Sequence, residues 1–518
     1  MAPRPGRSAL LLAATFVIGA CTPVPPPVPA RSELVIGIVG DPRSLIDDPA
    51  ASAVTALVVE PLVRRTATED LEPRLVESVP TVENGGAELV DEGDGQRIVA
   101  TFRIRQGVRW HDDVPVQAED VRFAFELDRV AVEGSPERAM ADRIDRVDVV
   151  DRRTVRVAYR AGERWDLYAL APRALPRHLL ADEAARQRYG EQPVHAGPFW
   201  MLERVPGRIV LVPFAGHVLD RPQIGRIVVR AFPDRTAVLT ALGRREIDIV
   251  PSPVLDADLA RTLDRSAGPS HVVLYTQAQA VAMLRMGPAF SEPALRRAVG
   301  LAIDRSRLAR SVFSGRVRAP ASYLVPPLWA AVELGAPRGA DPDAARALLE
   351  GARFRRGTFG IERDGARLAG TLLVPASRAL EDAARSVVSD LAAQGIAVSV
   401  EAREPSEIQG RVARGDFDLA LMPEPADDPR AATERYRGAV SPWFDLLGEA
   451  ARVADGRAEQ RLLYAELQRV WSASLPAVPL YQILKVDVVP ARLEGVRPAA
   501  HGAPITWNAG EWRMAAAR

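Results

Sequence analysis

The feature that most restricts the fold of this chain is a repeated alternation of apolar strands and capped helices. Residues 227–232 (IVVRAF) predict a buried strand, Asp234 then starts a helix that ends near Gly243, and Ile247 opens another strand. An aspartate at a helix start accepts hydrogen bonds from free N–H groups, and a glycine just past the end adopts the left-handed conformation. Such β-α-β units predict sheets covered by helices.

The same alternation returns in the second half of the chain. Strands are predicted at 371–375, 396–400 and 417–422, and a helix is predicted over 381–394, where Gly395 ends it. Side chains along 396–400 alternate as they do in a half-buried strand. These segments predict a second body built from helices and strands.

Residues 292–313 predict two further helices. Leu295, Val299 and Ile303 recur every four residues and therefore share one helix face, and Asp304 caps the second helix. Proline in a first helical turn costs no hydrogen bond, because its missing N–H has no partner there. Two more helix starts are predicted. One is Asp341-Pro342, with proline in the first turn, and the other is Ser406, which is expected to cap a short helix.

Residues 75–194 show a different pattern. Strands are predicted at 97–105, 147–150 and 154–159, around a single helix over 118–130. We therefore expect a separate α+β body in this part of the chain, and no short tandem repeat is visible in the sequence.

The N-terminal segment predicts secretion and a lipid anchor. Arg4 and Arg7 precede an apolar run, 9–20, that is too short for a membrane span of about 20 residues. The run ends in Ile-Gly-Ala before Cys21, the only cysteine of the chain, and this pattern resembles the bacterial lipobox. Cys21 is therefore the predicted lipidation site, the alternative being a plain signal peptide with a chance cysteine.

A proline-rich stretch, 22–32, follows Cys21. Proline lacks an N–H group and fixes φ, so this stretch predicts an extended tether between membrane and folded body. The remaining chain is long enough for two or three lobes. Basic and acidic residues number 67 each, so net charge gives no reason to expect nucleic-acid binding. No second apolar stretch is long enough to span a bilayer.

No catalytic or metal-binding motif stands out. The six histidines lack metal-ligand spacing, and His-Glu-x-x-His, Cys-x-x-Cys and phosphate-loop motifs are absent. The pair His111-Asp112 before a helix is only a weak sign of acid–base chemistry. We expect a protein that is not an enzyme and needs no metal or cofactor. A secreted hydrolase is the weaker alternative, since no nucleophile–base pair supports it.

The block at 102–121 carries the most informative resemblance. It contains an arginine, Gly-Val, an aromatic residue, His-Asp, a proline and Ala-Glu-Asp-Val, with Asp113 in place of a usual glycine. In this order and spacing it resembles the extracytoplasmic solute-binding proteins of oligopeptide and nickel ABC importers. Weaker matches occur in the expected order at 40–45, 60–62, 197–199, 295–305, 341–349, 415–419 and 479–481.

This resemblance implies an α/β fold like that of periplasmic binding proteins. Two mixed α/β lobes surround a hinge, an extra α+β subdomain is attached, and the solute is closed between the lobes. The predicted organisation is signal peptide and lipobox, tether, lobe I, accessory subdomain and lobe II. These parts are assigned to residues 1–21; 22–32; 33–74 with 195–285 and 480–518; 75–194; and 286–479, respectively.

The resemblance also points to ligand-binding candidates. In peptide binders of this family an aspartate in the loop after the strand at 417–422 holds the peptide amine; here the loop 423–429 lacks tryptophan and is shortened. Its carboxylates either hold an amine or are exposed turn residues, and the two readings stay open. The full set of candidates is Glu424, Asp427 and Asp428 in this loop, Tyr323 and Trp329 in a proline-rich loop, and Asp41 and Arg43 near the hinge.

The expected function is that of a lipid-anchored, substrate-binding component of an ABC importer. We expect a monomer on the outer face of a bacterial, actinobacterial membrane, with a small peptide or similar solute and with permease and ATPase subunits as partners. The alternative is an envelope role without transport. The segment 507–512 (WNAGEW) is similar to LpqW-like actinobacterial lipoproteins, which act in glycolipid biosynthesis.

Overall fold

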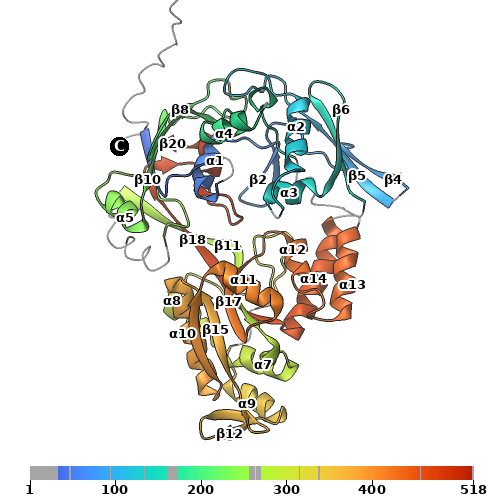
Figure 1. Ribbon diagram of the computed structural model, residues 1–518, viewed down its shortest axis with the longest axis vertical. Helices are drawn as coiled ribbons and strands as arrows, with labels where there is room; N and C mark the ends of the chain where they lie inside the picture. Colours follow the sequence, from blue (N-terminus) through green and yellow to red (C-terminus); the bar gives the residue numbers. More distant parts are fainter. Residues whose placement is uncertain are drawn as a thin grey trace, which may run out of the picture.

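The protein consists of two α/β lobes and an accessory subdomain that packs beside the first lobe (Figure 1). The predicted signal peptide, Cys21 and the tether lie outside the residues that the structure describes. The computed structural model describes residues 33–515 except for 46–47, 94, 134, 162–171, 181, 256–262, 264–269, 314, 336–338 and 455–456.

Lobe I is built on a four-stranded sheet with the order β1-β10-β9-β8, in which β1 and β10 are parallel. Apolar side chains of α1 and η7 cover one face, and α5 covers the other. The hairpin of β2 and β3 projects from this lobe. The bounds are β1 (Glu33–Val39), α1 (Ser52–Val58), β2 (Val63–Arg65), β3 (Leu71–Pro73), β8 (Phe199–Val205), β9 (Arg208–Pro213), β10 (Arg226–Phe232), α5 (Arg235–Gly243), β19 (Leu493–Glu494), η7 (Ile505–Glu511) and β20 (Arg513–Met514).

The accessory subdomain has an antiparallel sheet with the order β4-β5-β7-β6, and α2 packs against it. Asp120 in the first turn of α2 accepts hydrogen bonds from Trp110 Nε1 and from the backbone of Gln117 and Arg177, which supports a structural role for this block. The bounds are β4 (Ala87–Glu92), β5 (Gly95–Arg103), α2 (Ala118–Asp128), α3 (Pro136–Ala141), β6 (Ile144–Val149), β7 (Thr154–Tyr159) and α4 (Glu183–Glu191).

Lobe II contains a five-stranded sheet with the order β16-β15-β17-β11-β18. Helices α7 to α10 bury their apolar faces on one side of the sheet, and α11 packs on the other. The bounds are β11 (His271–Met286), α7 (Pro293–Ala302), α8 (Arg305–Phe313), α9 (Pro342–Gly351), β12 (Arg355–Gly357), β13 (Gly360–Arg363), β14 (Ala366–Arg367), β15 (Ala369–Pro375), α10 (Arg378–Ala393), β16 (Ala397–Arg403), α11 (Pro405–Arg414), β17 (Leu419–Pro425) and β18 (Ala477–Pro490).

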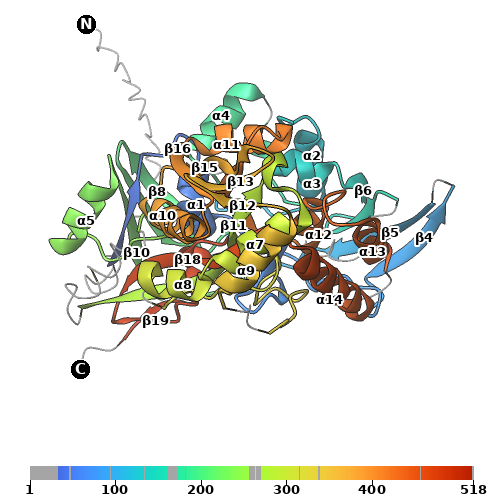
Figure 2. The same cartoon turned by 90° about the horizontal axis from the view of Figure 1, so that it is seen from below.

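Three helices form an additional layer of lobe II around buried Tyr436 and Trp471. They are α12 (Pro429–Glu434), α13 (Pro442–Val453) and α14 (Arg457–Ser474). Both views place α13 and α14 on the side of the accessory subdomain, and α8 and α10 on the side of α5 (Figure 2). Among the described residues, no helix is long and apolar enough to cross a membrane.

Most predicted helix starts are confirmed, and two local predictions need correction. Asp234, Asp304 and Asp341 each accept a hydrogen bond from a backbone N–H in the first turn. Ser406 does not cap α11; the helix begins at Pro405, which takes the first helical position instead. The strand predicted at 247–250 is reduced to two isolated bridges, from Ile249 to Ile36 and from Val250 to Val488.

Strands β11 and β18 form the hinge, because they run from one lobe into the other as an antiparallel pair. Residues 271–277 pair with 484–490, and residues 281–285 pair with 477–482. The ladder is irregular between these two parts, at residues 278–280 of β11. Lys485 beside this irregularity donates to three carbonyl oxygens, those of Ala499, His501 and Ala503.

Replacing Gly287 by alanine is expected to lower the free energy of unfolding by about 3 kcal/mol, measured by urea titration. A Cβ atom at this position overlaps the carbonyl oxygen of Phe417, which is backbone and cannot rotate away. The matched control is Gly351→Ala at the end of α9, where a Cβ meets no neighbour within 4 Å. Its effect is expected to stay below about 1 kcal/mol; equal effects of both variants would contradict the steric reason.

Candidate ligand-binding site between the lobes

The two lobes touch where the β2–β3 hairpin meets the loop after β17. Arg65 Nη1 donates to the carbonyl oxygen of Asp427 over 3.3 Å. Beside it, Arg143 of the accessory subdomain lies 3.6 Å from the carboxylate of Asp428. Both contacts join segments far apart in the sequence, so this junction depends on the relative position of the lobes.

Glu69 in the turn of the hairpin has an unusual environment at this junction. Its backbone adopts φ 70°, a left-handed conformation that residues other than glycine, asparagine and aspartate rarely adopt. The residue is only 5 % exposed, and one carboxylate oxygen lies 3.5 Å from Arg65. Its other oxygen, Oε1, is buried and accepts no hydrogen bond from a described residue. Burial raises the pKa of Glu69, although the charge of Arg65 works against this.

Gln279 lies in the irregular part of the hinge, next to Glu69. Its backbone N–H donates to Ala500 of lobe I and its carbonyl accepts from Ala426 of lobe II, so it connects both lobes. The side chain is 3 % exposed and interacts with the Glu69 carboxylate, which lowers the pKa of Glu69, but the two groups are not well aligned as a hydrogen bond. A buried carboxamide with incomplete hydrogen bonding costs up to about 1–3 kcal/mol, which a bound polar molecule can offset.

Asp427, Arg457 and Trp329 complete the surroundings of Glu69. The charge of Asp427 contributes to the raised pKa of Glu69, and the charge of Arg457 lowers it. The Arg457 guanidinium lies 4.8 Å from the ring centroid of Trp329, in a cation–π contact. The junction therefore combines two carboxylates, two guanidinium groups and an aromatic ring, which suits a ligand with charges of both signs. Of the predicted residues, Asp427 acts on Glu69 through its charge, and Trp329 is connected to the junction through Arg457.

Glu424, another predicted residue, is buried but already compensated. Arg285 donates to one carboxylate oxygen, and Tyr436 donates to the other over 2.9 Å. Arg435 lies 3.4 Å from the same carboxylate. With this many donors, Glu424 is suited to holding β17 against β11 and α12 rather than to binding an incoming amine.

Tyr323 and Asp428 have evident structural contacts. Tyr323 is buried among Tyr436, Phe444 and Trp471, and its hydroxyl lies 2.8 Å from Thr433 Oγ1. Asp428 is the N-cap of α12, where it accepts from two backbone N–H groups. Among the described residues, Tyr323 and Asp428 therefore make their hydrogen bonds to other groups and not to Glu69 or Gln279.

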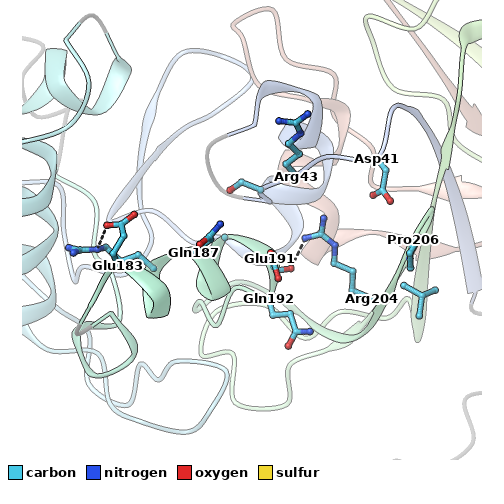
Figure 3. A pocket seen from close by; sticks show the side chains of 12 residues that line it. Asp41, Arg43, Glu183, Gln187, Glu191, Gln192, Arg204 and Pro206 are labelled. Carbon is cyan, nitrogen blue, oxygen red and sulfur yellow. Dashed lines mark hydrogen bonds and ion pairs between the residues drawn. The ribbon is translucent and has the colours of Figure 1, made fainter.

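Asp41 and Arg43 line a different pocket, of about 880 Å³, between lobe I and α4. Figure 3 shows Asp41 and Arg204 on one side of this pocket and Glu183 on the opposite side. Asp41 accepts a hydrogen bond from the backbone of Gly207 over 2.7 Å. The described lining of this pocket contains no residue of lobe II, so the structure does not bring Asp41 and Arg43 into the junction around Glu69.

A buried ionic cluster joins Glu60, Arg74, His217 and Asp220. The ligand atoms of Glu60, His217 and Asp220 lie within 4.8 Å of one another, as in a metal site. Arg74, however, donates to both carboxylates and so supplies the positive charge that a metal ion would bring. His217 Nε2 lies 3.0 Å from the Glu60 carboxylate, and its Nδ1 lies 3.0 Å from the backbone nitrogen and 3.2 Å from the carbonyl oxygen of Asp220. Burial alone raises the pKa of Glu60, but these donors lower it to about 2.

Sequence reasoning missed Glu69, Gln279 and Arg65. A weak signal was present for Gln279, since polar glutamines at 277 and 279 interrupt an otherwise apolar strand. No local pattern marks Glu69, because its burial results from contact with a lobe that is distant in the sequence.

Comparisons with known proteins agree with this architecture. The family profile of bacterial extracellular solute-binding proteins, family 5, matches residues 70–439. Di/tripeptide-binding protein 2 of Pseudomonas aeruginosa is 26 % identical over 451 residues, covering 77 % of this chain and 81 % of its own. The dipeptide-binding protein of Escherichia coli is 24 % identical over 421 residues, covering 73 % and 77 %.

Solved structures show the same two-lobed fold. The oligopeptide-binding protein of Thermus thermophilus, solved with a pentapeptide, has a TM-score of 0.69 at 20 % identity, covering 93 % of this chain and 96 % of its own. NikA of Brucella suis, solved with Fe(III)-EDTA, has a TM-score of 0.77 at 18 % identity, covering 93 % and 99 %.

These findings define an extracytoplasmic solute-binding protein of the kind that serves ABC importers. The chain belongs to the bacterial extracellular solute-binding proteins, family 5. The two relatives named above are named as a di/tripeptide-binding and a dipeptide-binding protein.

The free energy of unfolding is expected to fall by about 3 kcal/mol through Glu60 alone as the pH drops from 4.5 towards 2. A lowered pKa means that the folded state binds the proton more weakly, so this stabilisation is present above pH 4.5 and lost in acid. Glu60→Gln is expected to be less stable at pH 7 and to show a smaller loss across that window. Urea titrations at pH 7, 4 and 3 measure both effects; parallel losses in both proteins would contradict the assignment.

Proposed function

We propose that this protein is a lipid-anchored substrate-binding component of an ABC importer, which captures a small peptide between its lobes and delivers it to permease and ATPase subunits. The observation that carries this proposal is the buried pair of Glu69 and Gln279 at the lobe junction, whose polar atoms interact with each other but lack well-aligned hydrogen bonds among the described residues. Peptide-binding relatives and peptide-bound structures of the same fold support the choice of ligand class.

The chemistry of the junction fits a short peptide. A peptide ammonium group is a suitable donor for Glu69 Oε1, since a charge-assisted hydrogen bond compensates a buried carboxylate. The carboxamide of Gln279 has one donor group and one acceptor, and a peptide group offers the complementary pair. Arg65 and Arg457 supply positive charge for the peptide carboxylate.

Because the two lobes are joined by a hinge, a bound peptide can change the angle between them. A molecule that contacts Glu69 in lobe I and Asp427 in lobe II gains both sets of contacts only when the lobes are together. Its binding therefore shifts the population towards the closed form. The size of the shift is set by how much more tightly the ligand binds the closed form than the open form. The closed form is the species that we expect the permease to recognise.

Affinity for a dipeptide or tripeptide is expected to fall about 10- to 100-fold in Glu69→Gln, because a charge-assisted hydrogen bond contributes about 1.5–3 kcal/mol. Isothermal titration of residues 22–518 with Ala-Ala and Ala-Ala-Ala measures the change. Glu119→Gln, on α2 of the accessory subdomain, where Glu119 is half-buried and pairs with Arg122, is the matched control and is expected to bind like the unaltered protein.

The pH profile gives a second test of the same contact. Only ionised Glu69 attracts an ammonium group, so affinity is expected to decrease as the pH falls through its raised pKa, and Glu69→Gln is expected to lack this step. Unchanged affinity in Glu69→Gln contradicts the assigned contact. If no peptide binds the unaltered protein, importer function with peptides is wrong, and a role in envelope assembly without transport becomes the better hypothesis.

Cys21→Ala is expected to move the protein from the membrane fraction to the soluble extracytoplasmic fraction. The thioether-linked lipid needs the cysteine sulfur, and the tether offers no other attachment. Fractionation followed by immunoblotting measures the distribution, with Thr22→Ala as the control next to the attachment site. Retention of Cys21→Ala in the membrane fraction would show that the anchor lies elsewhere.

A further inference from the structure

A second pocket lies in lobe II, directly beside the hinge, and has a volume of about 560 Å³. Its walls come from α8, from the segment 315–326, from residues 332–335 and from the hinge glutamines Gln277 and Gln482. This volume is within the range of about 300–1,000 Å³ that is usual for small-molecule sites. The pocket shares no lining residue with the junction around Glu69.

The pocket walls are mostly apolar. Val317, Leu324 and Val325 are almost completely buried and line it together with prolines and alanines. Such walls favour the apolar body of a ligand and give little specificity by themselves. The specificity must come from the polar groups among them.

Ser322 is one of these polar groups. It lines the pocket, is 3 % exposed, and its hydroxyl oxygen has no hydrogen-bond partner in the described part of the chain. Buried hydroxyl groups are nearly always paired, so this atom indicates a missing polar partner in the pocket.

Charge at the pocket favours an anion. Arg310 and Arg318 both line it, and neither side chain makes a hydrogen bond or ion pair with a described residue. Among the described residues of the lining, Glu333 is the one acidic residue. Two guanidinium groups against one carboxylate leave a positive excess, and guanidinium is the side chain best suited to holding a carboxylate.

The pocket is also held to both hinge strands. The backbone N–H of Gln482 donates to Arg318 O over 2.9 Å, and its side chain donates to Pro326 O over 2.7 Å. Gln277 reaches Arg316 O over 3.5 Å from the other strand. A molecule in this pocket therefore contacts lobe II and both strands that connect the lobes.

We infer that this hinge pocket binds a small monocarboxylate with an apolar body, at a site separate from the solute between the lobes. The carboxylate lies with Arg310 and Arg318, the hydroxyl of Ser322 donates to a polar atom of the ligand, and the apolar body fills the space beside Val325. This inference does not depend on the peptide proposal, because it rests on a different set of residues.

The test is isothermal titration of residues 22–518 with octanoate and, in parallel, with octanol, which has the same chain length and no charge. Saturable binding of octanoate is expected, with octanol at least tenfold weaker. The double variant Arg310→Gln/Arg318→Gln is expected to bind octanoate about 10- to 100-fold more weakly. Arg346→Gln/Arg469→Gln changes the net charge equally on exposed helix faces and is expected to bind normally.

A second variant separates the pocket from general charge effects. Ala309 lines the pocket, so Ala309→Phe is expected to fill it and abolish octanoate binding, with folding checked by circular dichroism. Glu69→Gln is expected to bind octanoate like the unaltered protein, whatever it does to peptide binding. Absent octanoate binding, equal affinity for octanol, or unchanged affinity in the double arginine variant would each overturn the inference.

Discussion

The antiparallel pairing of β11 with β18 is the interaction on which the rest of the molecule depends. One strand supplies Val478 and Leu480 to the core of lobe II and Val489 to the core of lobe I, so both cores rest on the same ladder. The ladder is irregular between the lobes, at residues 278–280, and has one further register shift within lobe II, between Ala282 and Met283. Bending is therefore confined to a few residues, and each lobe keeps its own sheet and core when the angle between them changes.

The buried charges of the protein fall into two groups with different consequences. Glu60 and Glu424 are surrounded by donors, and each fixes the packing of neighbouring elements. Glu69 is compensated only in part, by Arg65 and by a poorly aligned contact with Gln279, and it lies where the lobes meet rather than inside one of them. A folded protein tolerates such a partly compensated group at a site that a ligand completes, because the cost is removed on binding.

Much of the architecture was predictable from the sequence, because local rules determine it. Aspartate caps at 234, 304 and 341 and the apolar strands between them give the α/β lobes, and alternation near 154–159 gives the accessory sheet. The start of α11 was misplaced, because Pro405 competes with Ser406 for the same turn. The strand at 247–250 was overestimated, because its apolar side chains fill a core next to β18 without forming a continuous ladder.

The ligand-binding candidates were harder to predict than the fold. Asp427 and Trp329 were found through resemblance; Asp427 lies at the junction, whereas Trp329, like Tyr323, packs against the helical core of lobe II and contacts the junction only through Arg457. Sequence does not distinguish an aromatic side chain in a core from one at an interface. Glu69 and Gln279 acquire their significance only from the approach of two lobes, which no local pattern encodes.

Lys485 is a unique target for amine chemistry beside the irregular part of the β11–β18 ladder. It is the only lysine of the chain, and its ammonium group is held by three carbonyl oxygens of the segment 499–503 beside the irregular part of the ladder. Burial lowers the pKa of Lys485. Amine-directed chemistry on the folded body therefore has a single side-chain target, and the rate at which that amine reacts reports the release of the segment 499–503 from β18.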